Sequence, residues 1–253
     1  AFGDSKDPDE TMLHFDGFLQ GLPSGIQLFS LLGSNPALLE LLVTIMGGAP
    51  RLSEIITRRP HVFDGLLDPA IYRDIPTTAY LADRLDAFLD DRFGYEEKLD
   101  RLRIFSAEQK FLIGVRMLTG ALAPVAAGNS LSDLADLLLD RTFALVIAEF
   151  SAKHGNVSGG EAALLGLCKL GSRELTAGSD IDLILLYDHP EDAGESDGDK
   201  PLYPSHYYSR LTQRLIAAVS APTAEGVLYE LDLRLRPSGN KGPVATKLSA
   251  FKR

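Results

Sequence analysis

Residues 170–188 read LGSRELTAGSDIDLILLYD, and the second half of this stretch has the apolar character of a strand. Two aspartates, Asp180 and Asp182, stand at its beginning. Aspartate is depleted in strands and is costly to bury as a charge, so the pair needs a compensating partner. Because side chains alternate along a strand, both carboxylates would project from one face, roughly 6.5–7 Å apart at the backbone. A cation is the partner that this pattern favours.

A second strand is expected at 226–236, GVLYELDLRLR, where apolar and charged residues alternate. Its charged face carries Glu230, Asp232, Arg234 and Arg236, and Asp232 is the best candidate for a third carboxylate. When carboxylates cluster, their mutual repulsion raises the pKa of at least one of them. A bound divalent metal instead favours the ionised form of every carboxylate in the cluster. Ligands that are all oxygen select Mg²⁺ or Mn²⁺ over zinc. The three aspartates therefore predict a magnesium or manganese site.

A further strand is expected at 163–170, ALLGLCKL, and Gly171 and Ser172 follow it at a turn. Glycine permits close backbone approach, and the Ser172 hydroxyl with adjacent N–H groups can hold phosphate oxygens. A phosphate site next to a metal site favours phosphoryl or nucleotidyl transfer. In such reactions, two metals about 3.5–4 Å apart activate the attacking oxygen and stabilise the leaving one.

Each of these features has an ordinary explanation when it is taken alone. A Gly-Ser turn is weak evidence, Asp-x-Asp at the start of a strand is more often a surface or capping pair, and a polar strand face is usually solvated. The three features in this order favour a catalytic site. The sequence contains no Walker or G-x-G-x-x-G motif, so P-loop and dinucleotide-binding classes have no support. Its one G-x-S-x-G match, GESDG at 194–198, lies in an acidic, glycine-rich stretch and not at a strand-to-helix turn, so it does not support a hydrolase.

The composition limits the class of protein. The 253 residues are 45% hydrophobic with a formal net charge of −10, which disfavours nucleic acid as a partner but leaves a nucleotide possible. One cysteine, Cys168, and five histidines argue against a disulfide framework and a structural zinc site. The first residues do not resemble a signal peptide, and no apolar run approaches the ~18 residues of a membrane span. We therefore expect a cytoplasmic protein with no membrane partner.

The sequence pattern of residues 1–155 predicts a helical domain. At 34–48, SNPALLELLVTIMGG, Asn35 can cap a helix and Pro36 suits its first position, while two glycines end it. Similar patterns occur at 76–93, 95–120 and 130–150, with a turn expected at 123–130.

After residue 160 the pattern changes to strands, an acidic loop at 189–203 that we expect to be exposed or partly disordered, and a helix at 205–221. That helix would place Tyr208, Leu211, Leu215 and Val219 on one face. The predicted fold class is α+β: a helical domain at 1–155 and an α/β domain with a mixed sheet at 156–253.

The order of Gly-Ser, Asp-x-Asp and a third strand aspartate resembles the nucleotidyltransferase superfamily that includes DNA polymerase beta. More narrowly, KLGSRELTAGSDIDLILLYD (169–188) and LYELDLRLRPSGNKGPVATKLSAF (228–251) are similar to the glutamine synthetase adenylyltransferase family. The helical residues match more loosely, chiefly through SLSDLADLLL (130–139). The resemblance implies a polymerase-beta-like domain that follows a helical one.

The resemblance also implies an activity and roles for residues. One half of such an enzyme transfers AMP from ATP to a tyrosine of glutamine synthetase, and the other half removes it by phosphorolysis. Asp180 and Asp182 would bind both metals, and Asp232 would bind the catalytic one and help to take the tyrosine proton. The remaining residues would contact ATP phosphates or leaving pyrophosphate, although either arginine could equally form a structural salt bridge: Gly171, Ser172, Arg234 and Arg236.

The segments TAGSD (176–180) and PSGNKG (237–242) are more similar to the sequence of the adenylylating half. The removing half tends to carry Asn-Tyr-Ser-Ser-Asp in place of the first segment. Cys168 departs from the family, which usually has glycine there, and we expect it to be a tolerated small residue in a strand. The resemblance names glutamine synthetase as a partner and the PII signalling protein as a possible one. Two alternatives stay open: the removing half, and a non-catalytic module that senses nucleotide or a partner.

Overall fold

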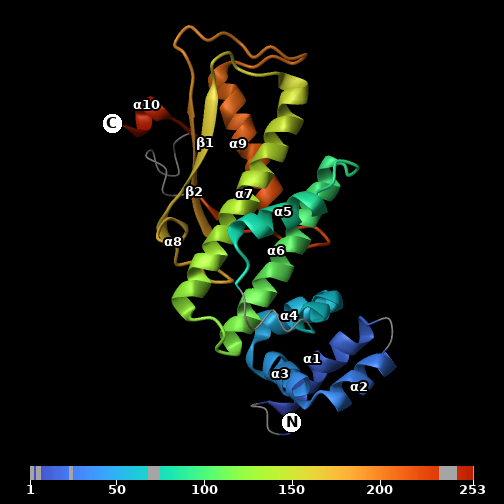
Figure 1. Cartoon of the computed structure of the whole chain (residues 1–253). Coiled ribbons are helices and arrows are strands. Elements are labelled where there is room, and N and C mark those ends of the chain that lie inside the picture. The colour runs from blue at the N-terminus through green and yellow to red at the C-terminus, as the bar shows by residue number, and fades with distance from the viewer. Residues whose placement is uncertain (1–2, 4–6, 23–24, 68–74, 234–243, 253) are drawn as a thin grey trace. The chain divides into compact units, whose positions relative to one another are not determined.

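The computed structural model describes residues 3, 7–22, 25–67, 75–233 and 244–252 of the chain (Figure 1). It contains helices and a four-stranded mixed sheet, which confirms the α+β class. Its internal contacts form two compact units, one of residues 1–77 with 107–127 and the other of 78–106 with 128–253. The predicted division into a helical domain at 1–155 and a second domain at 156–253 stays a prediction.

The first unit is helical and has its own apolar core. Its elements are α1 (Pro8–Gln20), α2 (Gly25–Ser34), α3 (Pro36–Gly48), α4 (Pro50–Arg58) and the 3-10 helix η2 (Pro60–Leu66), with the end of α6 and the start of α7. Several of these helices begin with proline, whose missing N–H has no intrahelical partner at that position. The fully buried side chains of its core include Phe18, Leu42, Ile45, Ile56 and Phe111.

Two sequence expectations about the helices need correction. Asn35 precedes α3 as predicted, but its side chain makes no capping hydrogen bond; its backbone carbonyl accepts from Leu38 and Leu39 instead. The turn expected at 123–130 is wrong, because α7 (Pro124–His154) begins inside it. Pro124 suits a first helical position, so the helix starts earlier than its apolar pattern indicates.

The other long helices, α5 (Thr78–Phe88) and α6 (Tyr95–Leu118), lie within the predicted ranges. Among the described residues, no single helix has the length and apolar composition to cross a membrane. The segments Leu28–Ser34 and Pro36–Gly48 meet those two criteria only when taken together, across a bend of 113°.

The sheet belongs to the second unit and is built around β2 (Ile181–Asp188). One edge of β2 pairs with the antiparallel strand β1 (Glu161–Gly166). The parallel strands β3 (Leu231–Asp232) and β4 (Ala245–Lys247) pair with the beginning and the later part of β2. Since a strand has two edges, β3 and β4 lie end to end along the second one. β2 is thus covered on both edges, which suits its apolar sequence.

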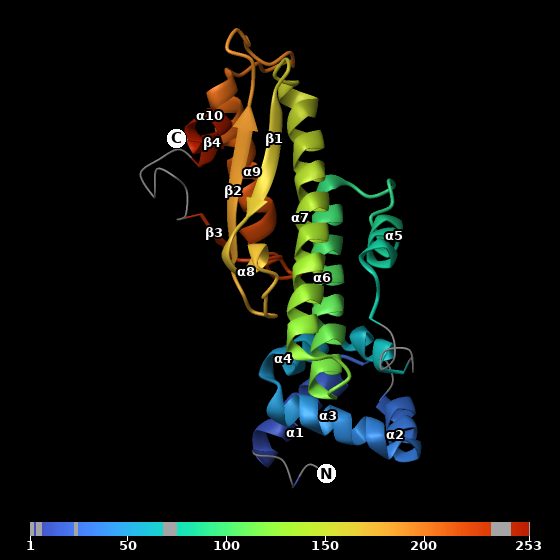
Figure 2. The ribbon, with the colours of Figure 1, turned by 60° about the vertical axis from the view of Figure 1, so that its left-hand side comes forward.

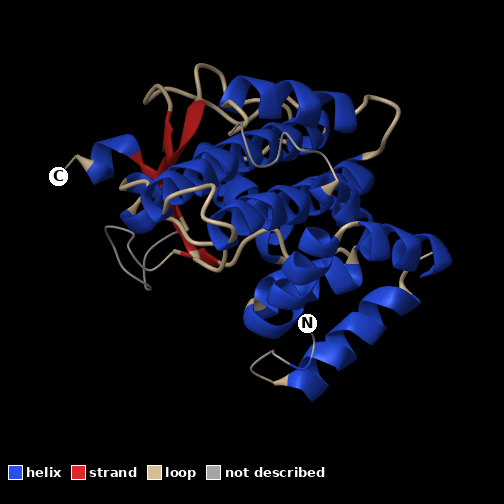
Figure 3. Ribbon diagram, turned by 60° about the horizontal axis from the view of Figure 1, so that its bottom comes forward, coloured by secondary structure: helices blue, strands red, loops and turns tan. Residues whose placement is uncertain are grey.

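Helix α9 (Pro204–Ser220) packs against one face of this sheet, and the long helices of this unit lie on that side of the strands (Figures 2 and 3). The face predicted for this helix is confirmed, because Tyr208, Leu211, Leu215 and Val219 are all buried. The Tyr208 ring stacks on Tyr187 of β2, with centroids 4.4 Å apart. Residues of β2 that share the parity of Tyr187 therefore face α9, and Asp182 faces the opposite side.

Two predicted strands are shorter than expected. The strand at 163–170 ends at Gly166, and Cys168–Gly171 forms the short helix α8, because the N–H groups of Leu170 and Gly171 both donate to the carbonyl of Leu167. The strand at 226–236 begins only at Leu231.

The cause of the second shortening is the preceding connection. The N–H groups of Leu228 and Tyr229 donate to the carbonyl of Val219 near the end of α9, so they are not available to a sheet. Residues 234–236 lie outside the described residues, and so does the C-terminal part of this predicted strand.

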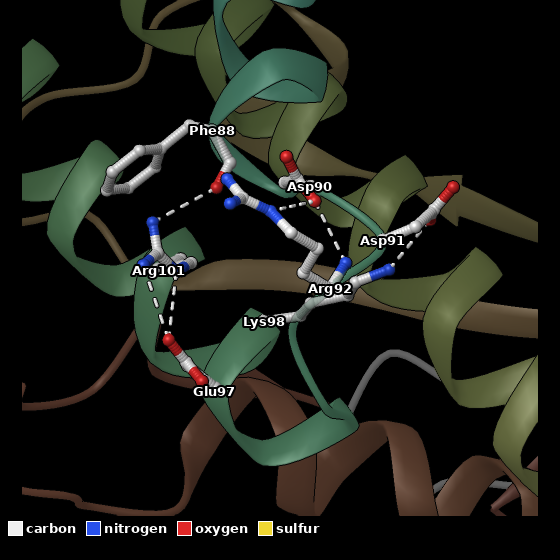
Figure 4. Close-up of polar contacts among 7 residues, drawn as sticks. All are labelled: Phe88, Asp90, Asp91, Arg92, Glu97, Lys98 and Arg101. Atoms are coloured by element: carbon white, nitrogen blue, oxygen red, sulfur yellow. Dashed lines mark hydrogen bonds and ion pairs between the residues drawn. The ribbon is translucent and has the colours of Figure 1, made fainter.

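The start of α6 is fixed by contacts of Arg101 (Figure 4). Its guanidinium lies 4.8 Å from the ring centroid of Phe88 and 3.4 Å from that of Phe93, and it also donates to Glu97 and to the Phe88 carbonyl. Cation–π contacts of this kind stabilise a charged group next to aromatic rings. The turn between α5 and α6 is thereby held closed.

Arg103, two residues further along α6, holds the end of α9. It is only 3% exposed, and it donates to the carbonyls of Ala218 (2.8 Å) and Ala221 (3.4 Å). It also pairs with Asp100, which accepts a 2.9 Å hydrogen bond from the Thr223 hydroxyl. A cation at a helix C-terminus satisfies its last carbonyls. These bonds fix the connection that leads from α9 into β3.

We predict that Arg103→Ala destabilises the chain by about 2–3 kcal/mol, because it removes charge-assisted hydrogen bonds from a buried site. The measurement is urea unfolding followed by circular dichroism. Arg58→Ala is the control, since the Arg58 side chain is 68% exposed and its ion pair with Glu54 should contribute less than about 1 kcal/mol. Equal losses in the two variants would contradict the role given to Arg103.

Candidate active site

Two of the three predicted aspartates are neighbours in the sheet. Asp182 of β2 is paired directly with Asp232 of β3, and the N–H of Ile181 donates to the carbonyl of Glu230 at 2.9 Å. Adjacent strands lie about 4.8 Å apart, and directly paired residues project from the same face. Both side chains are half-buried, and both lie on the face of the sheet opposite to α9.

Asp180 lies immediately before β2 and is exposed. It is not a strand residue, contrary to the expectation from its spacing, so strand alternation does not fix the direction of its side chain. A turn precedes it, in which the N–H of Ser179 donates to the carbonyl of Thr176 and the Thr176 N–H donates to the Ser179 hydroxyl.

The charges of all three aspartates act on the thiol of Cys168. Partial desolvation raises its pKa first, and the Asp182 carboxylate, which is within hydrogen-bonding reach, raises it further together with Asp232 and Asp180. The residue itself is exposed. The expectation that Cys168 lies in a strand is wrong, because it begins α8 with φ 46°. Glycine is favoured in that region, and another residue there costs about 1–2 kcal/mol.

The carboxylates are a suitable donor set for a hard divalent cation, although they do not form a finished cage. Among the residues that the structure describes, no group of three or more Asp, Glu, His or Cys side chains is close enough to hold a metal. The paired positions of Asp182 and Asp232 supply oxygen ligands from two strands. Because like charges repel when no cation is bound, closer approach of the carboxylates requires the metal itself.

The turn at Gly171 and Ser172 differs from the predicted phosphate cradle. The N–H of Gly171 donates to the Leu167 carbonyl, and the N–H of Ser172 donates to the Cys168 carbonyl at 2.8 Å. The expectation that these backbone groups are free for phosphate is therefore wrong in this conformation. The Ser172 hydroxyl donates to Glu174 at 2.9 Å, and because a hydroxyl can rotate, it remains a candidate phosphate ligand.

Arg173 is a residue of this site that the sequence reasoning missed. It has φ 63°, and its guanidinium binds Asp133 and Asp136, which lie three residues apart on α7. The hydrogen bond to Asp136 raises the pKa of Arg173. The pair is too exposed to add much stability, so its consequence is positional: it anchors the turn that carries Ser172 to α7.

No sequence signal identifies this anchor, because Arg173 and its partners are 37 and 40 residues apart and each looks like a solvated charge. The predicted phosphate ligands Arg234 and Arg236 lie outside the described residues.

Because Cys168 is the only cysteine, its alkylation reports on the carboxylates around it. The thiolate is the reactive form, so a raised pKa means slower reaction with iodoacetamide at a given pH. We predict that the midpoint of the pH–rate profile lies higher in the folded chain than in urea, and that Asp182→Asn lowers it.

The control is Asp188→Asn, at the other end of β2, which should leave the profile of Cys168 unchanged. Identical profiles for the Asp182 and Asp188 variants would show that the thiol is not beside the carboxylate of Asp182.

Comparison with known proteins identifies similar chains. The chain is 68% identical over its whole length to the bifunctional glutamine synthetase adenylyltransferase/adenylyl-removing enzyme of Mesorhizobium japonicum. It is 68% identical over 99% of its length to the enzyme of that name in Brucella melitensis, and 63% identical over its whole length to that of Agrobacterium fabrum. In each case the chain spans 26% of the relative's length.

A sequence model of the glutamate-ammonia ligase adenylyltransferase family matches residues 39–253. This range includes β1, β2 and β3, and with them every residue proposed for the site. The match covers most of the chain, so the chain belongs to the glutamate-ammonia ligase adenylyltransferase family.

Proposed function

We propose that the chain carries a Mg²⁺- or Mn²⁺-dependent nucleotidyltransferase domain that transfers AMP from ATP to a tyrosine hydroxyl of glutamine synthetase. The observation that carries this proposal is the register pairing of Asp182 with Asp232 in a chain of this family. The proposal includes a DNA polymerase beta-like fold for residues 156–253, preceded by a helical domain at 1–155.

In this proposal Asp180, Asp182 and Asp232 hold the divalent cation. When bound, the cation supplies charge neutralisation for the triphosphate and for the leaving pyrophosphate. In the transfer, a bond forms between the tyrosine oxygen and the α-phosphorus of ATP. The bond between the α-phosphorus and the oxygen that bridges to the β-phosphate breaks, and pyrophosphate leaves.

The residues of the chain have separate tasks in this reaction. A tyrosine hydroxyl is protonated at neutral pH, because its usual pKa is about 10. Asp232 is suited to accept that proton as the new bond forms, since carboxylates are common general bases. The Ser172 hydroxyl would turn from Glu174 to a phosphate oxygen, while Arg173 keeps the turn on α7. Arg234 and Arg236 would neutralise the pyrophosphate.

The partners and the location belong to the proposal as well. The name of these relatives includes glutamine synthetase, and we extend that substrate to this chain. The PII signalling protein as a regulator and a cytoplasmic location remain predictions from the sequence.

A second candidate is the removal of AMP by phosphorolysis, because the relatives' name joins adenylyltransferase to an adenylyl-removing enzyme. The pattern TAGSD at 176–180 favours the adenylylating half. A non-catalytic module that senses nucleotide is the remaining alternative.

The test is intact-mass analysis of glutamine synthetase after incubation with the chain, ATP and Mg²⁺. We predict a gain of one adenylyl group per subunit, and a loss of at least about 100-fold in rate for Asp182→Asn because transition-state charge is no longer stabilised. Asp188→Asn, which removes the same charge at the far end of β2, should keep the activity.

Two outcomes would contradict the main proposal. If the chain releases ADP from adenylylated glutamine synthetase and phosphate but never adds AMP, it is the removing half. If it binds glutamine synthetase equally well with Asp182→Asn and catalyses neither reaction, the sensing module is correct.

A further inference from the structure

The second unit contains a hollow of about 720 Å³ away from the aspartates, which we call the basic hollow. It is lined by the last turn of α7 (Phe150, Lys153, His154), by one face of α9 (Arg210–Ala217) and by residues 200–202 of the loop between β2 and α9. The aspartates lie where β2 begins, whereas this loop follows the end of β2 (Figure 1). The volume is in the range of small-molecule sites.

The wall of the basic hollow is built by specific backbone contacts. The N–H groups of Gly198 and Lys200 donate to the carbonyls of His154 and Lys153, and Nδ1 of His154 donates to the carbonyl of Lys200 at 2.6 Å. The backbones cross so closely that a Cβ on Gly155 would lie 2.1 Å from the nitrogen of Gly198. The acidic loop expected to be exposed or partly disordered is therefore tied to α7 in this part.

Four cations line the basic hollow: Lys153, Lys200, Arg210 and Arg214. No carboxylate lines it among the described residues, although the chain has a net charge of −10. None of the four makes an ion pair with another described residue. Arg210 and Arg214 are four apart on one helix, where like charges destabilise. An anion between them would remove that repulsion.

The four cationic residues are exposed, but they converge from three segments on one concave surface. An adjoining hollow of about 180 Å³ shares Lys153 and Arg214 but is also lined by the carboxylates of Glu96 and Glu149. Between these two hollows, and among the described residues, a lining with positive charges alone is therefore limited to the basic hollow. The floor of the basic hollow is partly apolar, with Phe150 and Leu202, and Gln213 offers a neutral hydrogen-bonding group. This lining suits an anionic ligand that also has a less polar part.

We propose that the basic hollow binds a small organic molecule that carries two or more phosphate groups. Arginine binds phosphate through two parallel N–H donors, and lysine adds a mobile positive charge. The four cations come from α7, α9 and the loop, so a compact group of phosphates could contact all three segments. The site is separate from the aspartates, and the proposal does not depend on the proposed catalytic function.

The test is isothermal titration of the full chain with inorganic triphosphate in the presence of EDTA, which prevents metal-assisted binding at the aspartates. We predict one binding site, an affinity that falls with added salt, and a loss of about tenfold for Arg214→Gln because a charge-assisted hydrogen bond is removed. The double variant Arg210→Gln with Arg214→Gln should lose about as much again. Asp182→Asn should bind as the unmodified chain does.

The matched control is Arg84→Gln, which removes an exposed arginine from α5 in the same unit, outside the basic hollow. Equal losses in Arg84→Gln and Arg214→Gln, no effect of the double variant, or no binding by the unmodified chain would each overturn the proposal. Lys200→Gln lies on the loop and leaves α9 intact, so it repeats the test if an α9 variant does not fold. Equal affinity for citrate would overturn the assignment to phosphate.

Discussion

The short parallel pairing of β2 with β3 is the constraint on which the candidate active site depends. It brings Asp182 and Asp232, fifty positions apart in the chain, to directly opposed positions on one face of the sheet. Two adjacent carboxylates are electrostatically unfavourable, so the pairing must be held by its surroundings. Those surroundings are the apolar body of β2, the face of α9 beneath it, and the contacts of Arg103 that fix the connection between α9 and β3.

The two faces of β2 have different tasks. The face that carries Tyr187 packs against Tyr208 of α9 and contributes apolar burial, which is the main source of stability in this unit. The opposite face begins with Asp182, which is paired with Asp232 of the neighbouring strand. The strained backbone of Cys168 lies beside this second face, and strain of this kind is often found at functional sites.

Much of this arrangement could be predicted from residue patterns. The strand predicted at 180–188, observed at Ile181–Asp188, follows from a short apolar run bounded by turn residues, and the buried face of the helix at 205–221 follows from its helical periodicity. The short helix α8 could not be predicted, because its apolar residues fit a strand equally well and backbone bonds to Leu167 decide the outcome. The anchor of Arg173 and the basic hollow depend on tertiary contacts between segments far apart in the chain, for which no alternation or spacing gives a signal.

The most direct measurement of the central claim is a crystal structure of the chain with Mn²⁺ and a non-hydrolysable ATP analogue, in which anomalous scattering locates the metal. The account predicts a manganese ion bound by carboxylate oxygens of both Asp182 and Asp232, at roughly the 2.0–2.2 Å of small divalent cations. It would be contradicted if the metal lay elsewhere, or if the carboxylate of Asp232 pointed to the face of the sheet that packs against α9.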